Sequence, residues 1–170
     1  RTRLDLVLND FVAGAVANGV INILSDGTPW RPLIHVTDMA RAIDWAVTRA
    51  PDNGGSMSIV NAGSDEWNCQ VKELAIAVAS QIPGTKVEIN ADSIPDRRSY
   101  KVDFTKFKEL APSYQPIVSL QEAVAGLKDG LISMGFSDVD FRDSDFMRLN
   151  ILNNHIISNR MNDNLKWVAI

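Results

Sequence analysis

Cysteine, histidine and long apolar runs are all scarce in this chain. Its 170 residues include one cysteine and two histidines. The single thiol, Cys69, forms neither an internal disulfide nor a cysteine-based zinc site, which fits a reducing, cytoplasmic compartment. No apolar run approaches the ~18 residues of a membrane span, so no membrane partner is expected. The first residues, Arg1 to Asp5, have no long apolar segment behind them and do not form a secretory signal.

Positive charge is not in excess either. The chain has 17 lysines and arginines against 21 aspartates and glutamates, a formal net charge of −4. A nucleic-acid-binding module normally carries a basic face and a high pI, so no nucleic-acid partner is expected. Hydrophobic residues make up 45% and charged residues 22% of the chain, which excludes a disordered polar chain. The length corresponds to one domain, or to one domain with a tail.

Predicted helices alternate with short predicted strands. Apolar residues three and four apart predict helices over residues 4–18, 37–47, 70–81, 104–110 and 119–134, and another around 146–157. Short β-branched or alternating runs predict strands over 20–24, 32–36, 57–60 and 86–89. Ser119, with Glu122 three residues later, predicts a capping box at the start of one helix. The alternation indicates an α/β fold.

Motifs that would identify a reaction are absent. The chain has no G-x-G-x-x-G loop, no G-x-S-x-G elbow and no H-E-x-x-H pair. The only cysteine, Cys69, has no histidine close to it in sequence and is not expected to be a nucleophile. The residues by themselves therefore indicate an acidic α/β domain with a few candidate anion-binding arginines.

One short stretch, from Ser25 to Asp38, combines a tight turn, an arginine, a predicted strand and a helix start. Arg31 can offer a planar fork to a phosphate or carboxylate, and the alternative is a surface salt bridge. His35 is expected to be a structural histidine on the strand rather than a base. Asp38 is expected to cap the free N–H groups of the helix that it begins.

A second candidate lies in the loop after Pro95. The adjacent Arg97 and Arg98 can clamp an anion, and the alternative is a solvated charged loop. Residues 61–63, Asn-Ala-Gly, follow a predicted strand, where small residues let a ligand or the next helix approach closely.

The motifs occur in a characteristic order. They are the turn from Ile23 to Gly27, Arg31, Ile34-His35-Val36, Asp38, Ala40-Arg41-Ala42, Asn61-Ala62-Gly63, Glu73-Leu74-Ala75, Arg98, Tyr100, Asp103 and Lys106. This order, from about Leu4 to Leu131, resembles the C-terminal half of the extended short-chain dehydrogenase/reductase family. The resemblance is to its NAD-dependent epimerase/dehydratase group, which acts on nucleotide-diphosphate sugars.

The resemblance implies a fold and a division of the chain. Residues 1–136 would be the C-terminal part of a Rossmann-like doubly wound sheet, together with the small mixed α/β region that binds substrate. Residues 137–170 lie outside the family pattern and are expected to form a helical tail of unassigned role.

The resemblance also implies binding residues. Arg31 and Arg98 would grip the diphosphate of a nucleotide sugar, with Arg97 as the alternative if the loop alignment slips by one. The strand that ends at Leu24 would border the base. Asp5 and Leu6 would lie near the sugar nucleotide.

The family's cofactor and catalytic motifs are missing from this chain. Members bind NAD or NADP through an N-terminal glycine-rich loop and use a Tyr-x-x-x-Lys pair. Here Tyr100 and Tyr114 are followed four residues later by Phe104 and Val118. The resemblance therefore implies that a longer parent protein holds NAD(P) mainly through residues outside this chain. That parent would be an oxidoreductase or isomerase, namely an epimerase, dehydratase or reductase, and this chain would contribute no catalytic residue.

Two readings of the chain as a unit stay open. It is the substrate-binding fragment of such an enzyme, or it is a non-catalytic binding or oligomerisation module. In the second case a homodimer, or a complex with the missing N-terminal half, is expected, because surface that the other half normally covers would be exposed.

Overall fold

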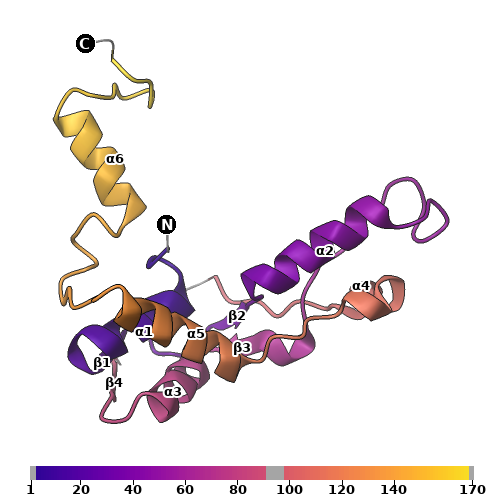
Figure 1. The fold of residues 1–170 in the computed structure, drawn as a ribbon, viewed down its shortest axis with the longest axis horizontal. Coiled ribbons are helices and arrows are strands. Elements are labelled where there is room, and N and C mark those ends of the chain that lie inside the picture. Colours follow the sequence, from indigo (N-terminus) through magenta and orange to yellow (C-terminus); the bar gives the residue numbers. More distant parts are fainter. Residues whose placement is uncertain (1–2, 91–97, 169–170) are drawn as a thin grey trace.

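The computed structural model describes residues 3–90 and 98–168 (Figure 1). It is a mixed α/β fold with a small parallel sheet, as the sequence predicts. The helices and strands, in chain order, are α1 (Val7–Asn18), β1 (Val20–Ile23), β2 (Trp30–Pro32), α2 (Val36–Thr48), the 3-10 turn η1 (Asp65–Trp67), β3 (Asn68–Gln70), α3 (Val71–Gln81), β4 (Lys86–Ile89), α4 (Thr105–Leu110), the 3-10 turn η2 (Pro112–Tyr114), α5 (Leu120–Ser133) and α6 (Arg148–Ile157).

The main core lies between three helices and the parallel strand pair. β1 and β4 run parallel, with Val20 opposite Lys86, and the crossover between them contains β2, α2, η1, β3 and α3. Helices α1, α3 and α5 pack together beside this pair (Figure 1). Gly14 allows the close contact of α1 with β1, because a Cβ there would lie 2.6 Å from the Val20 carbonyl oxygen. On α1, α3 and α5 the apolar faces predicted from residue spacing are thus the faces that are buried, whereas on α2 the predicted face of Met39, Ile43 and Val47 is exposed.

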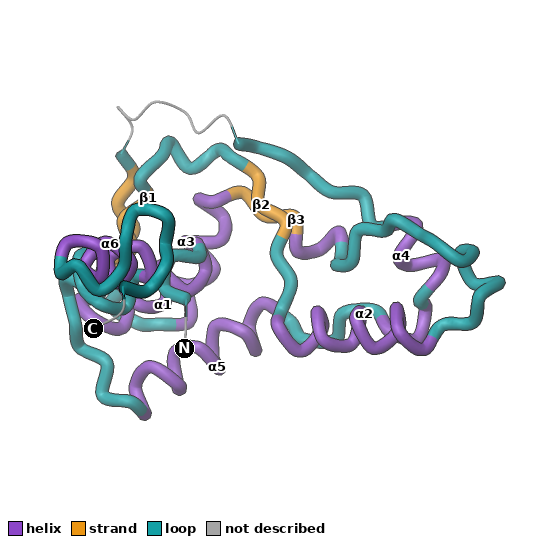
Figure 2. Tube along the Cα trace, turned by 90° about the horizontal axis from the view of Figure 1, so that it is seen from above, coloured by secondary structure: helices purple, strands orange, loops and turns teal. Residues whose placement is uncertain are grey.

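A second, smaller cluster lies on an arm that extends from the main core (Figure 2). Its centre is Trp45 of α2 against Phe107 of α4, with ring centroids 5.6 Å apart in an edge-to-face arrangement. Ala42 and Ala111 complete the buried set. At the base of the arm, β2 pairs antiparallel with β3, which places Arg31 opposite Cys69.

The C-terminal segment returns to the main core before it projects outward in α6 (Figure 1). Phe136 and Phe141 are buried in the main core, and Phe146 packs against it. Beyond α6, Met161 forms a bridge with Trp167, whose ring packs edge-to-face on His155 with centroids 5.1 Å apart. Within residues 3–90 and 98–168, no helix has the length and apolar character needed to cross a membrane.

Most predicted helices and strands are confirmed, some with shifted ends. Helix α1 begins three residues later than predicted, at Val7, while α3 and β4 follow their predicted ranges closely. The capping box at α5 is present, with the Glu122 carboxylate accepting from the Ser119 N–H at 2.8 Å. These features depend on residues close together in sequence, which is why they could be read directly.

Two predicted strands are wrong. Residues 57–60 are irregular, and Met57 and Ile59 are each 80% exposed, because no strand in the described part of the chain pairs with them. The strand expected at 32–36 instead spans Trp30–Pro32, because its partner β3, which was not predicted, covers only these positions. In both cases the available pairing partner, rather than local β propensity, decided where a strand formed.

The roles expected for His35 and Asp38 are also corrected. His35 is not on a strand but caps α2, where its Nδ1 accepts from the Thr37 N–H at 3.3 Å. Asp38 does accept backbone N–H groups, but not those of its own helix. Its carboxylate accepts from Ile117 at 3.0 Å and from Val118 at 3.1 Å, and it is only 1% exposed. It therefore joins α2 to the segment that leads into α5.

Candidate functional site

Strand β2 holds the segment that carries Arg98. The Trp30 N–H donates to the Ser99 hydroxyl at 3.1 Å, and the Lys101 ammonium lies 3.6 Å from the centroid of the Trp30 ring. The Arg31 guanidinium donates to the Arg98 carbonyl oxygen. Arg31 and Arg98 therefore come together although they are 67 residues apart in sequence.

Two further hydrogen bonds attach the segment after Arg98 to β3. The Asn68 side chain donates to the Val102 carbonyl at 2.9 Å and accepts from the Val102 N–H at 3.0 Å. An amide that makes both bonds to one residue acts like a strand partner. The segment after Arg98 is thus fastened to both β2 and β3.

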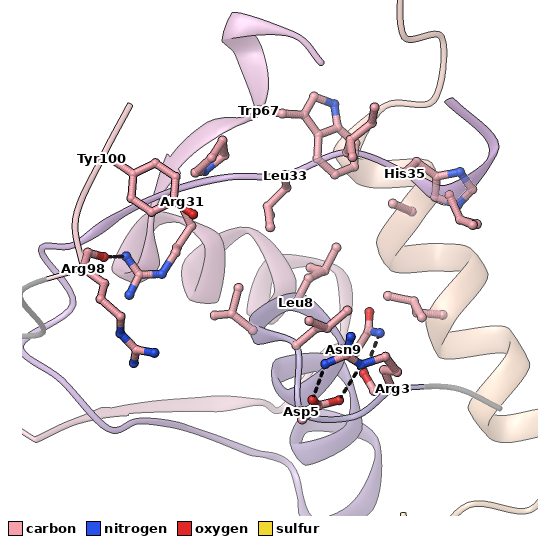
Figure 3. A pocket seen from close by; sticks show the side chains of 17 residues that line it. Arg3, Asp5, Leu8, Asn9, Arg31, Leu33, His35, Trp67, Arg98 and Tyr100 are labelled. Carbon is pink, nitrogen blue, oxygen red and sulfur yellow. Dashed lines mark hydrogen bonds and ion pairs between the residues drawn. The ribbon is translucent and has the colours of Figure 1, made fainter. Parts of the chain in front are cut away.

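The first hollow is a cavity of about 840 Å³ beside these two arginines (Figure 3). Its polar lining includes Arg3, Asp5, Asn9, Arg31 and Arg98. Its apolar lining includes Leu6, Leu8, Leu33, Trp67 and Tyr100. A mostly apolar cavity with a few convergent polar groups is typical of a small-molecule site.

Asp5 is paired within this hollow. Arg3 donates to its two carboxylate oxygens at 3.1 and 2.6 Å, and Asn9 donates to the Arg3 carbonyl at 2.8 Å (Figure 3). The hydrogen bond from Arg3 is the largest cause that holds the pKa of Asp5 below its usual value, and the charge of Arg148 adds to it. Asp5 is therefore ionised at neutral pH and is not a proton donor.

The second hollow, of about 600 Å³, adjoins the first. Both are lined by Asp5, Val7, Arg31 and Arg98, so these four residues form a shared wall. The second hollow also includes Asn22, Leu24 and Ser25 from β1 and its turn, and Arg142 and Met147 from the C-terminal segment.

The structure thus brings together most of the residues expected at a site. Arg31, Arg98 and Asp5 line both hollows, Leu6 lines the first and Leu24 the second. Arg97 lies outside the described residues.

The lining of the two hollows is positive in an acidic protein. Among the described residues it includes four arginines and two aspartates, while the whole chain has a net charge of −4. Arg3 is paired with Asp5, and Arg142 with Asp10. The excess of two positive charges in this concave lining favours an anion.

Cys69 and His35, two groups able to do nucleophilic or acid–base work, are poorly placed for it. Burial raises the pKa of the Cys69 thiol, and the charge of Glu73 raises it further, so this side chain stays protonated at neutral pH. His35 lines the first hollow, but its Nδ1 is occupied by the Thr37 N–H. Within the described part of the chain, no group of three or more histidine, cysteine or acidic residues is placed to hold a metal ion.

The described residues also do not fit the diphosphate of a dinucleotide cofactor. That group is usually cradled where a strand passes through a glycine-rich loop into a helix. Here β1 leads through the turn at Gly27 to β2, and β3 passes directly from Gln70 into α3 without a glycine. We therefore assign no NAD(P)-binding residue to the described ranges.

Some lining residues were not predicted as site residues. Arg3 could have been identified from the sequence, because the oppositely charged Asp5 lies two residues away. Nothing in the sequence pointed to Trp67 or Met147, because they lie far along the chain from the residues beside them in the hollows.

Residues 2–63 match the NAD dependent epimerase/dehydratase family, which supports the resemblance predicted from the motifs. The matched range includes Asp5, Leu6, Leu24 and Arg31, whereas Arg98 and the C-terminal segment lie beyond it. A search of curated proteins gave no match to the chain.

Proposed function

We propose that this chain is the substrate-binding part of an NAD-dependent epimerase/dehydratase that acts on a nucleotide-diphosphate sugar. One observation carries the proposal: Arg31 and Arg98, which are distant in sequence, stand together on the wall shared by two hollows. The family match over residues 2–63 supports the same assignment.

The proposed ligand spans both hollows. Its diphosphate lies at the shared wall, where the planar guanidinium groups of Arg31 and Arg98 suit paired oxygen atoms. The sugar occupies the first hollow, near Leu6 and Tyr100, and the nucleoside occupies the second, near Leu24. A ligand with two uncharged ends and a charged middle matches this order of lining residues.

The chain's part in the reaction is to bind and orient the substrate. In the family, NAD(P) accepts a hydride from a sugar carbon, and in epimerases it returns the hydride to the other face. Because the described ranges hold no dinucleotide cradle and the sequence has no Tyr-x-x-x-Lys pair, no bond-breaking step is assigned to this chain. Arg31 and Arg98 fix the diphosphate, and the first hollow holds the sugar beside it.

Isothermal titration of nucleoside diphosphates and their sugar conjugates into the 170-residue chain tests this proposal. Hydrogen bonds to charged groups contribute about 1.5–3 kcal/mol each, so Arg31→Ala and Arg98→Ala are each expected to weaken binding about 10- to 100-fold. Arg160→Ala is the matched control, because Arg160 is exposed and lines neither hollow. Affinities within twofold of the wild type in both test variants would contradict the proposal.

A second candidate function, an oligomerisation module, is favoured by one face of α2. Val36, Met39, Ile43 and Val47 lie three and four residues apart and are 72%, 48%, 59% and 79% exposed. A stripe with this spacing can pair with its own copy across a two-fold axis. Sedimentation equilibrium at high concentration tests this candidate, since a monomer there argues against it.

A further inference from the structure

We propose that the C-terminal segment from Phe141 to Met147 forms part of the nucleotide-binding site. In this proposal Met147 is the wall against which the nucleoside rests, and the ion pair between Asp10 and Arg142 positions that wall. The inference rests on the proposed function, and it adds residues that lie beyond the family match. It gives a role to part of the tail that sequence patterns left unassigned.

The ion pair is well formed and partly shielded from water. Arg142 Nε and Nη2 donate to the two carboxylate oxygens of Asp10 at 2.7 and 2.6 Å, a bidentate arrangement. The Arg142 side chain is 31% exposed and that of Asp10 is 16% exposed. Asp10 belongs to α1, which is packed in the main core, so the pair ties the tail to a rigid element.

Apolar anchors and a side-chain amide hold the segment on both sides of Arg142. Phe136 packs edge-to-face against Phe141 and Phe146, with ring centroids 5.9 and 5.2 Å away. The Asn150 amide donates to the carbonyl groups of Arg142 at 3.0 Å and Ser144 at 3.1 Å, which closes the turn before α6. Met147, the residue before α6, is thereby fixed at the edge of the second hollow.

The second hollow suits a flat, mostly apolar group with a polar edge. Met147, Leu24 and Val71 supply apolar surface. Asn22 is half-buried in the same lining. An amide offers donors and an acceptor together, which are the groups that the edge of a nucleobase requires.

The position of Met147 allows nucleoside binding to be tested separately from diphosphate binding. Arg31 and Arg98 line both hollows, but Met147 lines only the second. A change at Met147 therefore acts on the nucleoside end of the ligand and leaves the diphosphate wall intact.

The test compares a nucleoside diphosphate with inorganic pyrophosphate, which has no nucleoside, by titration calorimetry on the full chain. Met147→Ala is expected to weaken nucleoside diphosphate binding about fivefold to tenfold, because part of a buried thioether side chain is lost, and to leave pyrophosphate affinity unchanged. Met147→Leu, which conserves volume, is expected to stay within twofold of the wild type. Met134→Ala is the matched control, because Met134 is 57% exposed and lines neither hollow.

Arg142 is tested as a positioning residue. Arg142→Met is expected to produce the same selective loss of nucleoside diphosphate affinity. It is also expected to speed limited trypsin cleavage after Arg148, which is exposed but held in the first turn of α6. Arg142→Lys, which keeps the charge beside Asp10, is expected to restore most of the affinity and of the protection. A loss of pyrophosphate affinity equal to the loss of nucleotide affinity would overturn the positioning role, since it would show a general effect on the fold.

The outcomes separate this inference from the proposed function. If Arg31→Ala abolishes nucleotide binding while Met147→Ala leaves it unchanged, the proposed function stands and the inference is wrong. If the wild-type chain binds no nucleoside diphosphate, both fall. Selective loss in Met147→Ala, with pyrophosphate affinity retained, supports both.

Discussion

Asp38 offers a direct test of how the arm is joined to the main core. Its carboxylate accepts from the N–H groups of Ile117 and Val118 at 3.0 and 3.1 Å, across 79 and 80 residues of sequence. Arg41 Nε lies 3.8 Å from the same carboxylate. Asp38→Ala removes both hydrogen bonds and leaves the Arg41 charge without this partner.

The magnitude follows from the type and burial of these bonds. A hydrogen bond to a charged group contributes about 1.5–3 kcal/mol. Asp38 is 1% exposed, but Ile117 is 66% exposed, so water can partly replace the lost bond to its N–H. We therefore use the lower end of the range for each bond, which gives a loss of about 3 kcal/mol in the free energy of unfolding. That loss lowers the urea midpoint by about 1.5 M if the slope is about 2 kcal/mol per M.

Urea unfolding followed by circular dichroism at pH 7 is the assay. Asp44→Ala is the matched control, because Asp44 is an exposed aspartate on the same helix and its removal changes the net charge equally. The control is expected to stay within about 0.5 kcal/mol of the wild type. Asp38→Asn is expected to fall between, since its amide oxygen can still accept one N–H. A midpoint for Asp38→Ala within 0.3 M of the control would refute the reasoning.

Two further predictions concern helices α1 and α5. Gly14→Ala in α1 is expected to destabilise the chain by about 1–3 kcal/mol, because the new Cβ would lie 2.6 Å from the Val20 carbonyl oxygen. Gly126→Ala in α5 is expected to stabilise the chain by up to about 1 kcal/mol, because nothing lies within 4 Å of the new Cβ. Thermal unfolding checks both variants, and midpoints that shift in the same direction would contradict the packing described. At the start of α5, hydrogen bonds from the N–H and hydroxyl of Ser119 hold the pKa of Glu122 below its usual value. This cap therefore stabilises the fold at pH values above the unfolded-state pKa, and its contribution is lost as the pH falls through the folded-state pKa. The stability difference between the wild type and Glu122→Gln is therefore expected to shrink between pH 6 and pH 3, and a difference that grows on acidification would contradict this.

Short-range patterns account for what could be predicted about the fold. The helices α1, α3 and α5 follow from apolar residues three and four apart, and the capping box at Ser119 from two residues three positions apart. The turn after α1 follows from Gly19, whose φ of 69° lies in the left-handed region. The periodicity of residues 57–60 was equally local, but it failed because a strand also needs a partner.

The site was predictable in its parts but not in its arrangement. Arg31 and Arg98 were identified from motif order, and their shared wall depends on the contact between β2 and the segment after Arg98. Nothing in the sequence pointed to Arg142 and Met147, because the ion pair of Arg142 with Asp10 joins residues 132 positions apart.

The sequence by itself determined the α/β class, the main helices, the acidic balance and the motif order that resembles the epimerase/dehydratase family, which residues 2–63 match. Only the tertiary structure decided that β3 pairs with β2, that His35 caps a helix, and that Asp38 holds a distant segment. It also decided that the tail reaches the second hollow. The physical reason is that helix periodicity and caps are set by residues within a few positions of one another, whereas pairings and hollows depend on how distant segments pack.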